Sequence, residues 1–242
     1  MKTPKILVAI CNYNHSQYLK ESIESIQNQS YGNLDICVVD DGSNDSGVVR
    51  GILDASSDDS RVRSLFQTNN GKWHALNEAI RTSEADICTS HDADDVSLMD
   101  RIEIQFKSMI HSNSIHNLCG FYHCWDENDV IKWKDKRYNP EQNIKIFDCN
   151  TVGNLVMTGF KHPSINHYFT GDFETAGVSG MFYKEIWDRG IRFNPPDLGL
   201  RVLLSEDSDF NFRITQAFNK TSVTALPLYC YRRNTSTNQE LL

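Results

Sequence analysis

One pair of carboxylates in the sequence has the spacing of a metal site. Asp92 and Asp94 are separated by one residue, so in an extended backbone both side chains leave the same face and can reach one divalent cation. Hard oxygen ligands of this kind suit Mg²⁺ or Mn²⁺, which take their remaining ligands from water and from phosphates. The pair therefore implies a diphosphate partner. The alternative is a solvated acidic loop that caps a helix starting near Leu98.

Polar clusters follow three of the predicted strands, at the point where each strand ends. They are Asn12-Tyr13-Asn14, Asp40-Asp41 and Asp92-Ala93-Asp94. Ligands of open parallel sheets bind at the carboxyl ends of the strands, so three clusters on that edge favour a binding site there. Taken alone, Asp40-Asp41 is equally well explained as turn chemistry.

The elements that position these clusters follow from apolar periodicity. Short apolar runs alternate with helix-period segments through the first half, which is the pattern of βα units in a mostly parallel sheet. The predicted strands are residues 6–10, 34–39, 62–66, 85–89 and 178–183. The predicted helices are residues 16–26, 48–53, 75–80, 98–109 and 210–218.

The rhythm weakens beyond residue 112. A hairpin through Trp125 and Trp133 is predicted there, followed by loops over residues 134–173. No internal repeat or linker is visible, so two lobes around one continuous sheet fit better than two separable domains.

Composition and charge exclude several classes of protein. The 242 residues are 39% hydrophobic and 10% aromatic, which describes a folded chain rather than a disordered or fibrous one. A formal net charge of −8 argues against nucleic acid and anionic lipid as partners. No apolar run reaches the length of a signal-peptide core or a membrane span. The sequence therefore predicts a cytoplasmic protein with no transmembrane segment.

The cysteines and histidines predict no further metal site. Seven cysteines without a CxxC pair indicate reduced, mostly buried thiols. Cys119, His123 and Cys124 lie in an apolar run whose strand alternation would split them between two faces. His162 and His167 are five residues apart, which is wrong for one helix face, so surface or acceptor-side histidines are the better interpretation.

Five segments, in order and spacing, resemble those of family 2 glycosyltransferases with the GT-A fold. The segments are Ile10–Asn14, Val38–Asp45, Asn70–Asn77, Asp92–Asp95 and Ser205–Asp207. The resemblance implies an α/β, Rossmann-like, mostly parallel central sheet flanked by helices, with an acceptor-side lobe. Residues 1–110 would be the nucleotide-sugar-binding half and residues 111–242 the acceptor-binding half of one GT-A domain.

The resemblance also implies roles for residues that would contact the nucleotide. Tyr13 would stack on a uracil ring, with Cys11 beside it. A thiol cannot match the hydroxyl that the family often has at this place, so Cys11 would contribute a backbone contact. Asp41 would accept a hydrogen bond from the base, and Lys72 would lie near the diphosphate as a point charge.

The remaining implied roles belong to acidic residues. Asp92 would face the ribose or the metal, and Asp94 would be the direct metal ligand. In the Glu206-Asp207 pair, Asp207 would be the catalytic base. The alternative for this pair is a charge in the first turn of a helix, where carboxylates are favoured in any protein.

The activity implied by the resemblance is inverting, metal-dependent transfer of one sugar from a UDP-sugar to a hydroxyl acceptor, a glycan or a lipid-linked glycan. Polysaccharide biosynthesis is the implied setting. The Gln-x-x-Arg-Trp motif and membrane helices of processive members are missing, so the resemblance is to a non-processive enzyme. Asn234 stands where the family usually has a histidine, which puts a metal-binding role of that position in doubt.

Two other functions stay open at the level of sequence. One is a catalytically silent sugar-nucleotide or glycan-binding protein. The other is a nucleotidyltransferase, although Cys11–Ser16 contains neither the glycine nor the basic residues of its phosphate loop. The transferred sugar, the acceptor, the choice between Mn²⁺ and Mg²⁺ and the oligomeric state cannot be read from these residues.

Overall fold

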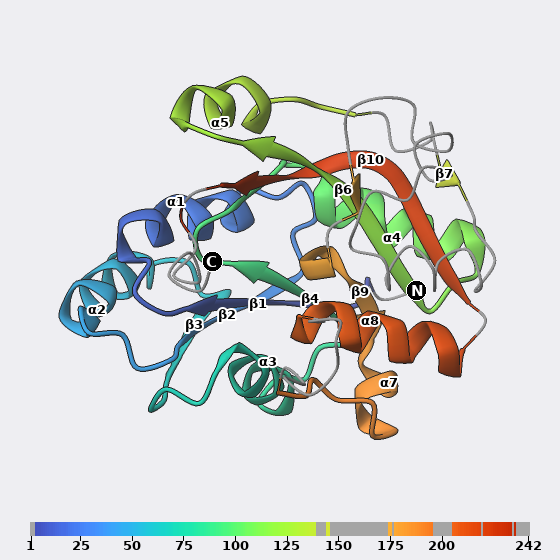
Figure 1. Ribbon diagram of the computed structural model, residues 1–242, viewed down its shortest axis with the longest axis horizontal. Helices are drawn as coiled ribbons and strands as arrows, with labels where there is room; N and C mark the ends of the chain where they lie inside the picture. The colour runs from blue at the N-terminus through green and yellow to red at the C-terminus, as the bar shows by residue number, and fades with distance from the viewer. Residues whose placement is uncertain are drawn as a thin grey trace.

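A ten-stranded sheet forms the centre of the protein, with helices on both faces (Figure 1). The computed structural model describes residues 3–138, 144–145, 174–175, 177–195, 205–218, 220–233 and 235. The strands are β1 (Ile6–Asn12), β2 (Leu34–Asp40), β3 (Val62–Phe66), β4 (Ile87–Asp92), β5 (Val96–Ser97), β6 (His116–Cys124), β7 (Ile144–Lys145), β8 (Glu174–Thr175), β9 (Met181–Tyr183) and β10 (Thr221–Arg232). The helices are α1 (Ser16–Gln27), α2 (Ser46–Ala55), α3 (Lys72–Arg81), α4 (Arg101–Ser112), α5 (Glu127–Lys134), α7 (Lys184–Asp188), α8 (Glu206–Ala217) and the 3₁₀ helix η1 (Gly177–Ser179).

The order of the sheet is β3-β2-β1-β4-β9-β6-β10-β5, with β7 paired to β10 and β8 to β6. Strands β1 to β4 are mutually parallel, as the βα pattern predicts. β9 is antiparallel to both β4 and β6, and β10 is parallel to β6. β6 and β10 therefore run in the same direction as β1 to β4. We refer to the edge at which Asn12, Asp40, Asp92, Cys124 and Arg232 end their strands as the carboxyl edge.

Alternating residues of β1 enter two separate cores, which explains its continuous apolar run. Ile6, Val8 and Ile10 pack with residues of α1, α2 and α4. Leu7 and Ala9 pack on the opposite face with residues of α3, α7 and α8. The latter three helices lie below the sheet in Figure 1. Side chains at the carboxyl edge are thus held between two buried layers.

The structure confirms the predicted strands and helices of the first half, with shifts of a few residues at their ends. The predicted strand over residues 178–183 is shorter, because Gly177–Ser179 forms a 3₁₀ turn before β9. The cysteines within the described residues are free thiols: Cys11, Cys37, Cys88, Cys119, Cys124 and Cys230. Cys119 and Cys124 of β6 pack in different clusters, as strand alternation predicts.

The hairpin predicted through Trp125 and Trp133 is wrong, because this segment begins helix α5. The Asp126 side chain accepts a hydrogen bond from the Asp129 backbone N–H at 3.1 Å. In return, the Asp129 carboxylate accepts from the Trp125 N–H at 2.9 Å. This reciprocal capping satisfies N–H groups at the helix start that would otherwise lack partners. Trp133 lies within the helix, where its ring stacks on Tyr122.

Strand β10 has no counterpart among the predicted elements, although it is the longest strand described. Of the loops predicted over residues 134–173, the described part contains the end of α5 and the short strand β7. His162, His167 and Asn234 lie outside the described residues. Among the helices that are described, none combines the length and the apolar character needed to cross a membrane.

Candidate active site

Hydrogen bonds from uncharged side chains hold together the ends of β1 and β2 and the loops that follow them. The Asn12 amide donates to Asp40 Oδ1 at 2.8 Å, and the Ser43 hydroxyl donates to the same oxygen at 2.6 Å. Asn14 has a left-handed backbone with φ of 59°, which asparagine adopts more readily than most residues. In that conformation its side chain accepts a hydrogen bond from the Asn44 N–H at 2.8 Å. The loops after β1 and β2 are therefore fastened to each other.

Asp41 fastens a third loop, the one before α3. Its Oδ1 accepts hydrogen bonds from the Gln67 side chain at 2.7 Å and from the Asn70 N–H at 2.8 Å, and its Oδ2 accepts from the Gly71 N–H at 2.9 Å. The neighbouring Gly42 has a φ of +75°, and a Cβ there would lie 2.7 Å from the backbone nitrogen of Asn69. Glycine is required at this close approach. A carboxylate has about four acceptor positions, so Asp41 retains one for a ligand.

The two residues predicted to contact uracil lie at the end of β1. Cys11 faces the core that contains α3, and burial raises the pKa of its thiol well above the ordinary value against the opposing effect of Lys72. Its thiol is therefore neutral at physiological pH. Tyr13 is half-buried in the loop that Asn12 and Asn14 fasten. Both residues lie beside the predicted site, and their contacts with a base remain a prediction.

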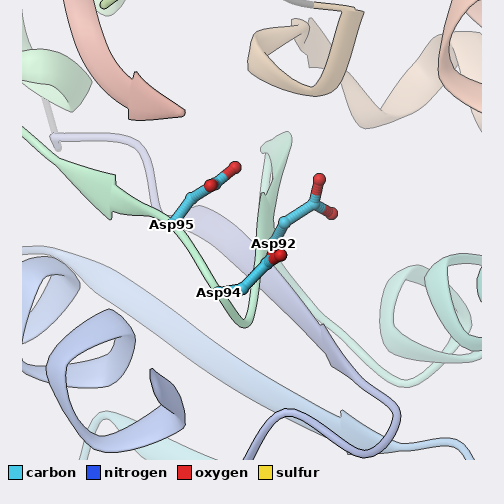
Figure 2. Close-up of side chains that lie close together, drawn as sticks. All are labelled: Asp92, Asp94 and Asp95. Atoms are coloured by element: carbon cyan, nitrogen blue, oxygen red, sulfur yellow. The ribbon is translucent and has the colours of Figure 1, made fainter. Parts of the chain in front are cut away.

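Three carboxylates meet on the tight turn after β4. Oxygens of Asp92, Asp94 and Asp95 lie within 4.8 Å of one another (Figure 2). Asp92 ends the strand, whereas Asp94 lies in the turn. The extended backbone assumed for the Asp92 and Asp94 pair is therefore wrong, although the pair does converge. The turn also brings in Asp95, which strand alternation would have directed away from Asp92 and which the sequence analysis missed.

The buried carboxylate of Asp95 makes this cluster fit a divalent cation. Asp95 is fully buried, and its Oδ1 accepts a hydrogen bond from the Arg232 N–H at 2.8 Å. Its Oδ2 has no hydrogen-bond partner among the described residues. Burial, followed by the charges of Asp94 and Asp92, raises the pKa of Asp95 well above its usual range. A divalent cation would relieve this like-charge crowding with the oxygen ligands that Mg²⁺ and Mn²⁺ prefer.

Lys72, at the first position of α3, connects the acidic turn with α8. Its Nζ lies 2.7 Å from Asp92 Oδ1, 2.9 Å from Asp207 Oδ2 and 3.8 Å from Glu206 Oε1. Burial opposes the charge on Lys72, but Asp207, Asp92 and Glu206 together outweigh it and raise its pKa well above the ordinary value. Lys72 is therefore a permanent cation between the two acidic groups. The structure thus brings together four predicted residues from three separate motifs.

Asp207 lies in the first turn of α8, where Ser205 caps the helix by accepting from the Ser208 N–H. One of its oxygens bonds Lys72, and the other, Oδ1, is buried without a hydrogen-bond partner among the described residues. Burial raises the pKa of Asp207 to about 6, against Lys72, which lowers it, and with Glu206, which raises it further. A carboxylate with a free oxygen and a pKa near the working pH has the properties of a general base.

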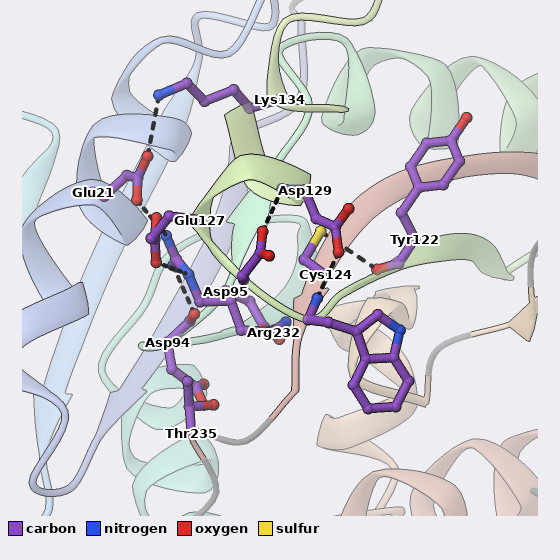
Figure 3. A network of polar contacts seen from close by, with 12 residues as sticks. Glu21, Asp94, Asp95, Tyr122, Cys124, Glu127, Asp129, Lys134, Arg232 and Thr235 are labelled. Atoms are coloured by element: carbon purple, nitrogen blue, oxygen red, sulfur yellow. Dashed lines mark hydrogen bonds and ion pairs between the residues drawn. The ribbon is translucent and has the colours of Figure 1, made fainter. Parts of the chain in front are cut away.

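Arg232 anchors the acidic turn from behind, and the sequence analysis gave it no role. It donates from its guanidinium to the backbone carbonyl of Asp94 at 2.8 Å, as Figure 3 shows. The same guanidinium pairs with Glu21 of α1 and Glu127 of α5, and its side chain is 4% exposed. Together with the bond from its N–H to Asp95, these contacts fix the turn to three other elements. The available sequence signal was its place two residues before Asn234, where the family usually has a histidine.

Tyr229 supports the acidic turn from the same strand. Its hydroxyl accepts a hydrogen bond from the Asp92 N–H at 3.0 Å. Its ring lies 5.0 Å from the guanidinium of Arg101 and makes an edge contact with His91 at the same distance. These three side chains are fully buried, so the strand end that presents Asp92 is rigidly held.

Comparison with known sequences connects these residues to a family. Residues 7–169 match the family described as Glycosyl transferase family 2. The chain is 27% identical over 226 residues to an uncharacterized glycosyltransferase, MJ1057, of Methanocaldococcus jannaschii. That alignment covers 90% of this chain and 70% of the relative.

Solved structures share the fold. S. aureus TarS, residues 1–349 in complex with UDP-GlcNAc, has a TM-score of 0.72 at 16% identity, covering 98% of this chain and 61% of that one. The mannosyltransferase PcManGT from Pyrobaculum calidifontis, in complex with GDP-Man and Mn²⁺, has a TM-score of 0.58 at 20% identity, covering 93% of this chain and 58% of that one. The chain thus has the GT-A fold and spans less than two thirds of either solved chain.

Proposed function

Because the chain belongs to glycosyl transferase family 2, we propose that it is an inverting, metal-dependent glycosyltransferase. It moves one sugar from a UDP-sugar to the hydroxyl of a glycan or glycolipid. Residues 1–110 hold the nucleotide sugar and residues 111–242 hold the acceptor. The observation that best supports this proposal is the unpartnered, buried Oδ1 of Asp207, joined through Lys72 to the acidic turn of Asp92.

In the proposed reaction, the acceptor hydroxyl forms a bond to the anomeric carbon while the bond from that carbon to the diphosphate oxygen breaks. Asp207 Oδ1 takes the hydroxyl proton, so no free alkoxide has to form. With one carboxylate base on the acceptor side and attack opposite the leaving group, the configuration inverts. Double displacement needs a second carboxylate as nucleophile on the donor side, and the proposal assigns none.

Lys72 and the acidic turn serve the leaving group. Asp94 and Asp92 are the proposed ligands of Mn²⁺ or Mg²⁺, with Asp95 behind them, and the ion would supply charge stabilisation to the departing UDP. Lys72 is protonated and lies between Asp92 and Asp207. A bound donor diphosphate could therefore form an ion pair with Lys72 in place of Asp207. That exchange would leave Asp207 free to act as base.

The nucleotide is proposed to bind where the loops after β1 and β2 are fastened. Tyr13 stacks on the uracil, Cys11 contributes its backbone, and Asp41 uses its remaining acceptor position for the N–H of the base. Support for a UDP-sugar comes from the fold neighbour TarS, which was solved with UDP-GlcNAc. Support for a metal comes from PcManGT, which was solved with GDP-Man and Mn²⁺.

A panel of nucleotides tests this proposal directly. Thermal unfolding is measured with UDP, GDP, CDP and dTDP, each with Mn²⁺, Mg²⁺ or chelator, because a ligand that binds the native state raises its midpoint. We expect selective, metal-dependent stabilisation by UDP, and UDP release from a UDP-sugar when acceptor is added. Stabilisation by UDP without any release of UDP would instead indicate a silent binding protein. A chain that no nucleotide stabilises would contradict the whole assignment.

A further inference from the structure

Arg232 is the last residue of β10 and Arg233 follows it, and the two adjacent arginines have opposite surroundings. Arg232 is buried and paired with two glutamates. Arg233 is half-buried, and within the described part of the chain it forms no ion pair with a carboxylate. Its Nε donates instead to Nδ1 of His123 at 2.9 Å, and its guanidinium lies 4.8 Å from the ring centroid of Tyr231. An imidazole and an aromatic face leave the positive charge of Arg233 without a compensating anion.

Aromatic side chains extend from this arginine along the sheet. Phe121 lies 4.8 Å from His123 and 5.5 Å from Tyr231, between ring centroids. Trp125 follows at 6.2 Å from His123, with Arg233 at 5.8 Å from its ring. Trp125 is 62% exposed, which is unusual for the largest apolar side chain. We refer to Phe121, His123, Trp125 and Tyr231 as the aromatic row.

The aromatic row lies at the carboxyl edge and on the side of the proposed base. β6 and β10 end at the same edge as β1, β2 and β4, so Trp125 and Arg233 follow strand ends in the same way as the acidic turn does. Phe121 and Tyr231 pack on Val178 of η1, which itself packs against α8. The Arg232 N–H, one residue from both Tyr231 and Arg233, bonds Asp95. The row therefore borders the acidic turn on one side and α8 on the other.

We propose that Trp125, His123 and Arg233 form a subsite for the acceptor, and that this acceptor bears an anionic group, a phosphate or a carboxylate, beside a sugar ring. The inference rests on the proposed function and names the class of its acceptor. The guanidinium N–H groups that do not face His123 would bond the anion, a charge-assisted contact. The exposed face of Trp125 would pack on the apolar face of the sugar.

The electrostatics of the chain favour this assignment to the acceptor. The proposed function already assigns Lys72 and the acidic turn to the donor diphosphate, so Arg233 is left for another anion. The chain has a net charge of −8, so an arginine without a carboxylate partner gives a locally positive potential on a negatively charged surface. Such a potential attracts and orients an anion that the rest of the surface would repel.

Matched sugar probes test the subsite. Binding of glucose 6-phosphate, glucuronate and glucose is measured by ligand-observed NMR on the chain saturated with UDP and Mg²⁺. We expect one or both anionic sugars to bind at least about tenfold more tightly than glucose, which corresponds to one charge-assisted hydrogen bond. The Arg233→Gln variant should remove this preference, and Arg233→Lys should keep part of it. Trp125→Ala should weaken all three probes.

A matched control is Arg192→Gln, because Arg192 lies 4.4 Å from the ring of Trp187 in a similar pair. Trp187 belongs to α7, which follows β9 at the opposite edge of the sheet. This variant should keep the preference for anionic sugars, and all variants should bind UDP as the parent chain does. The proposal is wrong if the parent prefers neither anionic sugar, if Arg233→Gln keeps the preference, or if it weakens UDP instead. A parent chain that fails to bind UDP contradicts the proposed function itself.

Discussion

Two parts of the proposed site, which we call its neutral end (the loops after β1 and β2) and its charged end (the acidic turn with Lys72 and the start of α8), are ordered by different interactions. At the neutral end, Asp40 and Asp41 accept hydrogen bonds from amides, a hydroxyl and backbone N–H groups of their own chain. At the charged end, one lysine lies among a set of crowded carboxylates: Asp92, Asp94, Asp95, Glu206 and Asp207. At the neutral end, folding supplies most of the hydrogen-bond donors that these two carboxylates need, and Asp41 keeps one acceptor position. The charged end retains an excess of negative charge and unpartnered oxygens that a cation and a proton would resolve.

This difference separates recognition from chemistry. A carboxylate that is held by several fixed donors, as Asp41 is by three, is already in place before a ligand arrives, which reduces the entropy lost on binding. At the charged end, burial and neighbouring like charges raise the pKa of Asp95 and Asp207, and such carboxylates have a strong affinity for cations and protons. Substitutions at the neutral end should therefore act on stability and nucleotide selectivity, and those at the charged end on turnover and metal affinity.

The largest effect is expected from removing the base at the charged end. Asp207→Asn should lower turnover by about two to four orders of magnitude, because the amide cannot take the acceptor proton. UDP affinity should stay nearly unchanged. The measurement is UDP release at saturating donor, together with UDP binding by calorimetry. Asp209→Asn is the matched control in the same helical turn, where the carboxylate pairs with Arg213; equal losses in both variants would place the base elsewhere.

The next largest effect is expected at the proposed metal ligand. Asp94→Ala should remove the enhancement of UDP affinity by Mn²⁺, a loss larger than the roughly 10- to 100-fold typical of groups that only orient a ligand. UDP affinity in chelator should be the same in the variant and the parent. Calorimetric titration of UDP with and without Mn²⁺ measures both values. An unchanged enhancement would remove Asp94 from the metal site.

A smaller effect on metal affinity is expected from substituting Arg232, which holds the acidic turn in place. Arg232→Lys keeps the positive charge near Glu21 and Glu127 but loses the forked donors, one of which bonds the Asp94 carbonyl. Metal affinity should fall by about 10- to 100-fold, as for other orienting groups. The fall should appear in Mn²⁺ binding to the chain in the presence of UDP. A variant that loses stability but keeps its metal affinity would show that Arg232 only joins the helices.

The sequence predicts the neutral end better than the charged one for a physical reason. The loops after β1 and β2 are made by neighbouring motifs, and their strands show the apolar periodicity directly. Lys72 and Asp207 are 135 residues apart in sequence, and the Asp95 contact with Arg232 spans 137. Periodicity carries no information about such pairings. The family resemblance supplied Asp207, whereas Asp95 and Arg232 emerge only from the folded chain.

The errors in the second half have local causes. The hairpin predicted through Trp125 and Trp133 overlooks Asp126 and Asp129, which form a capping pair that specifies a helix. The sequence does not predict β10, because Pro227 interrupts the strand pattern at a point where the pairing with β6 is irregular. In both cases the deciding signal was a polar or a proline residue rather than apolar spacing.

At the neutral end, the expected effect is on stability. Asp41→Ala leaves the Asn70 and Gly71 N–H groups without their acceptor, which should lower the free energy of unfolding by about 1–3 kcal/mol. UDP selectivity over GDP should also weaken, whereas the Mn²⁺ enhancement of the remaining affinity should persist. Chemical denaturation and the nucleotide panel measure these changes. A loss of metal enhancement in this variant would show that the two ends of the site are not separate.

The smallest expected effect at the charged end is a change in the pH dependence of kcat/KM. Because the pKa of Asp207 is raised to about 6 in the free chain, kcat/KM should be flat above pH 7 and fall about tenfold per unit below pH 6. Glu206→Gln removes a like charge that raises this pKa, so the fall should move to lower pH, whereas a fixed midpoint would exclude Glu206 as a cause. The free energy of unfolding depends on pH in the opposite direction to kcat/KM. A carboxyl whose pKa is higher folded than unfolded stabilises the fold when protonated, and this contribution is lost as pH rises through 6. The loss begins near the unfolded pKa of about 4 and is complete near pH 6. At the pH where Asp207 acts as a base, its charge therefore already destabilises the chain, as expected for a charge that substrate must complete.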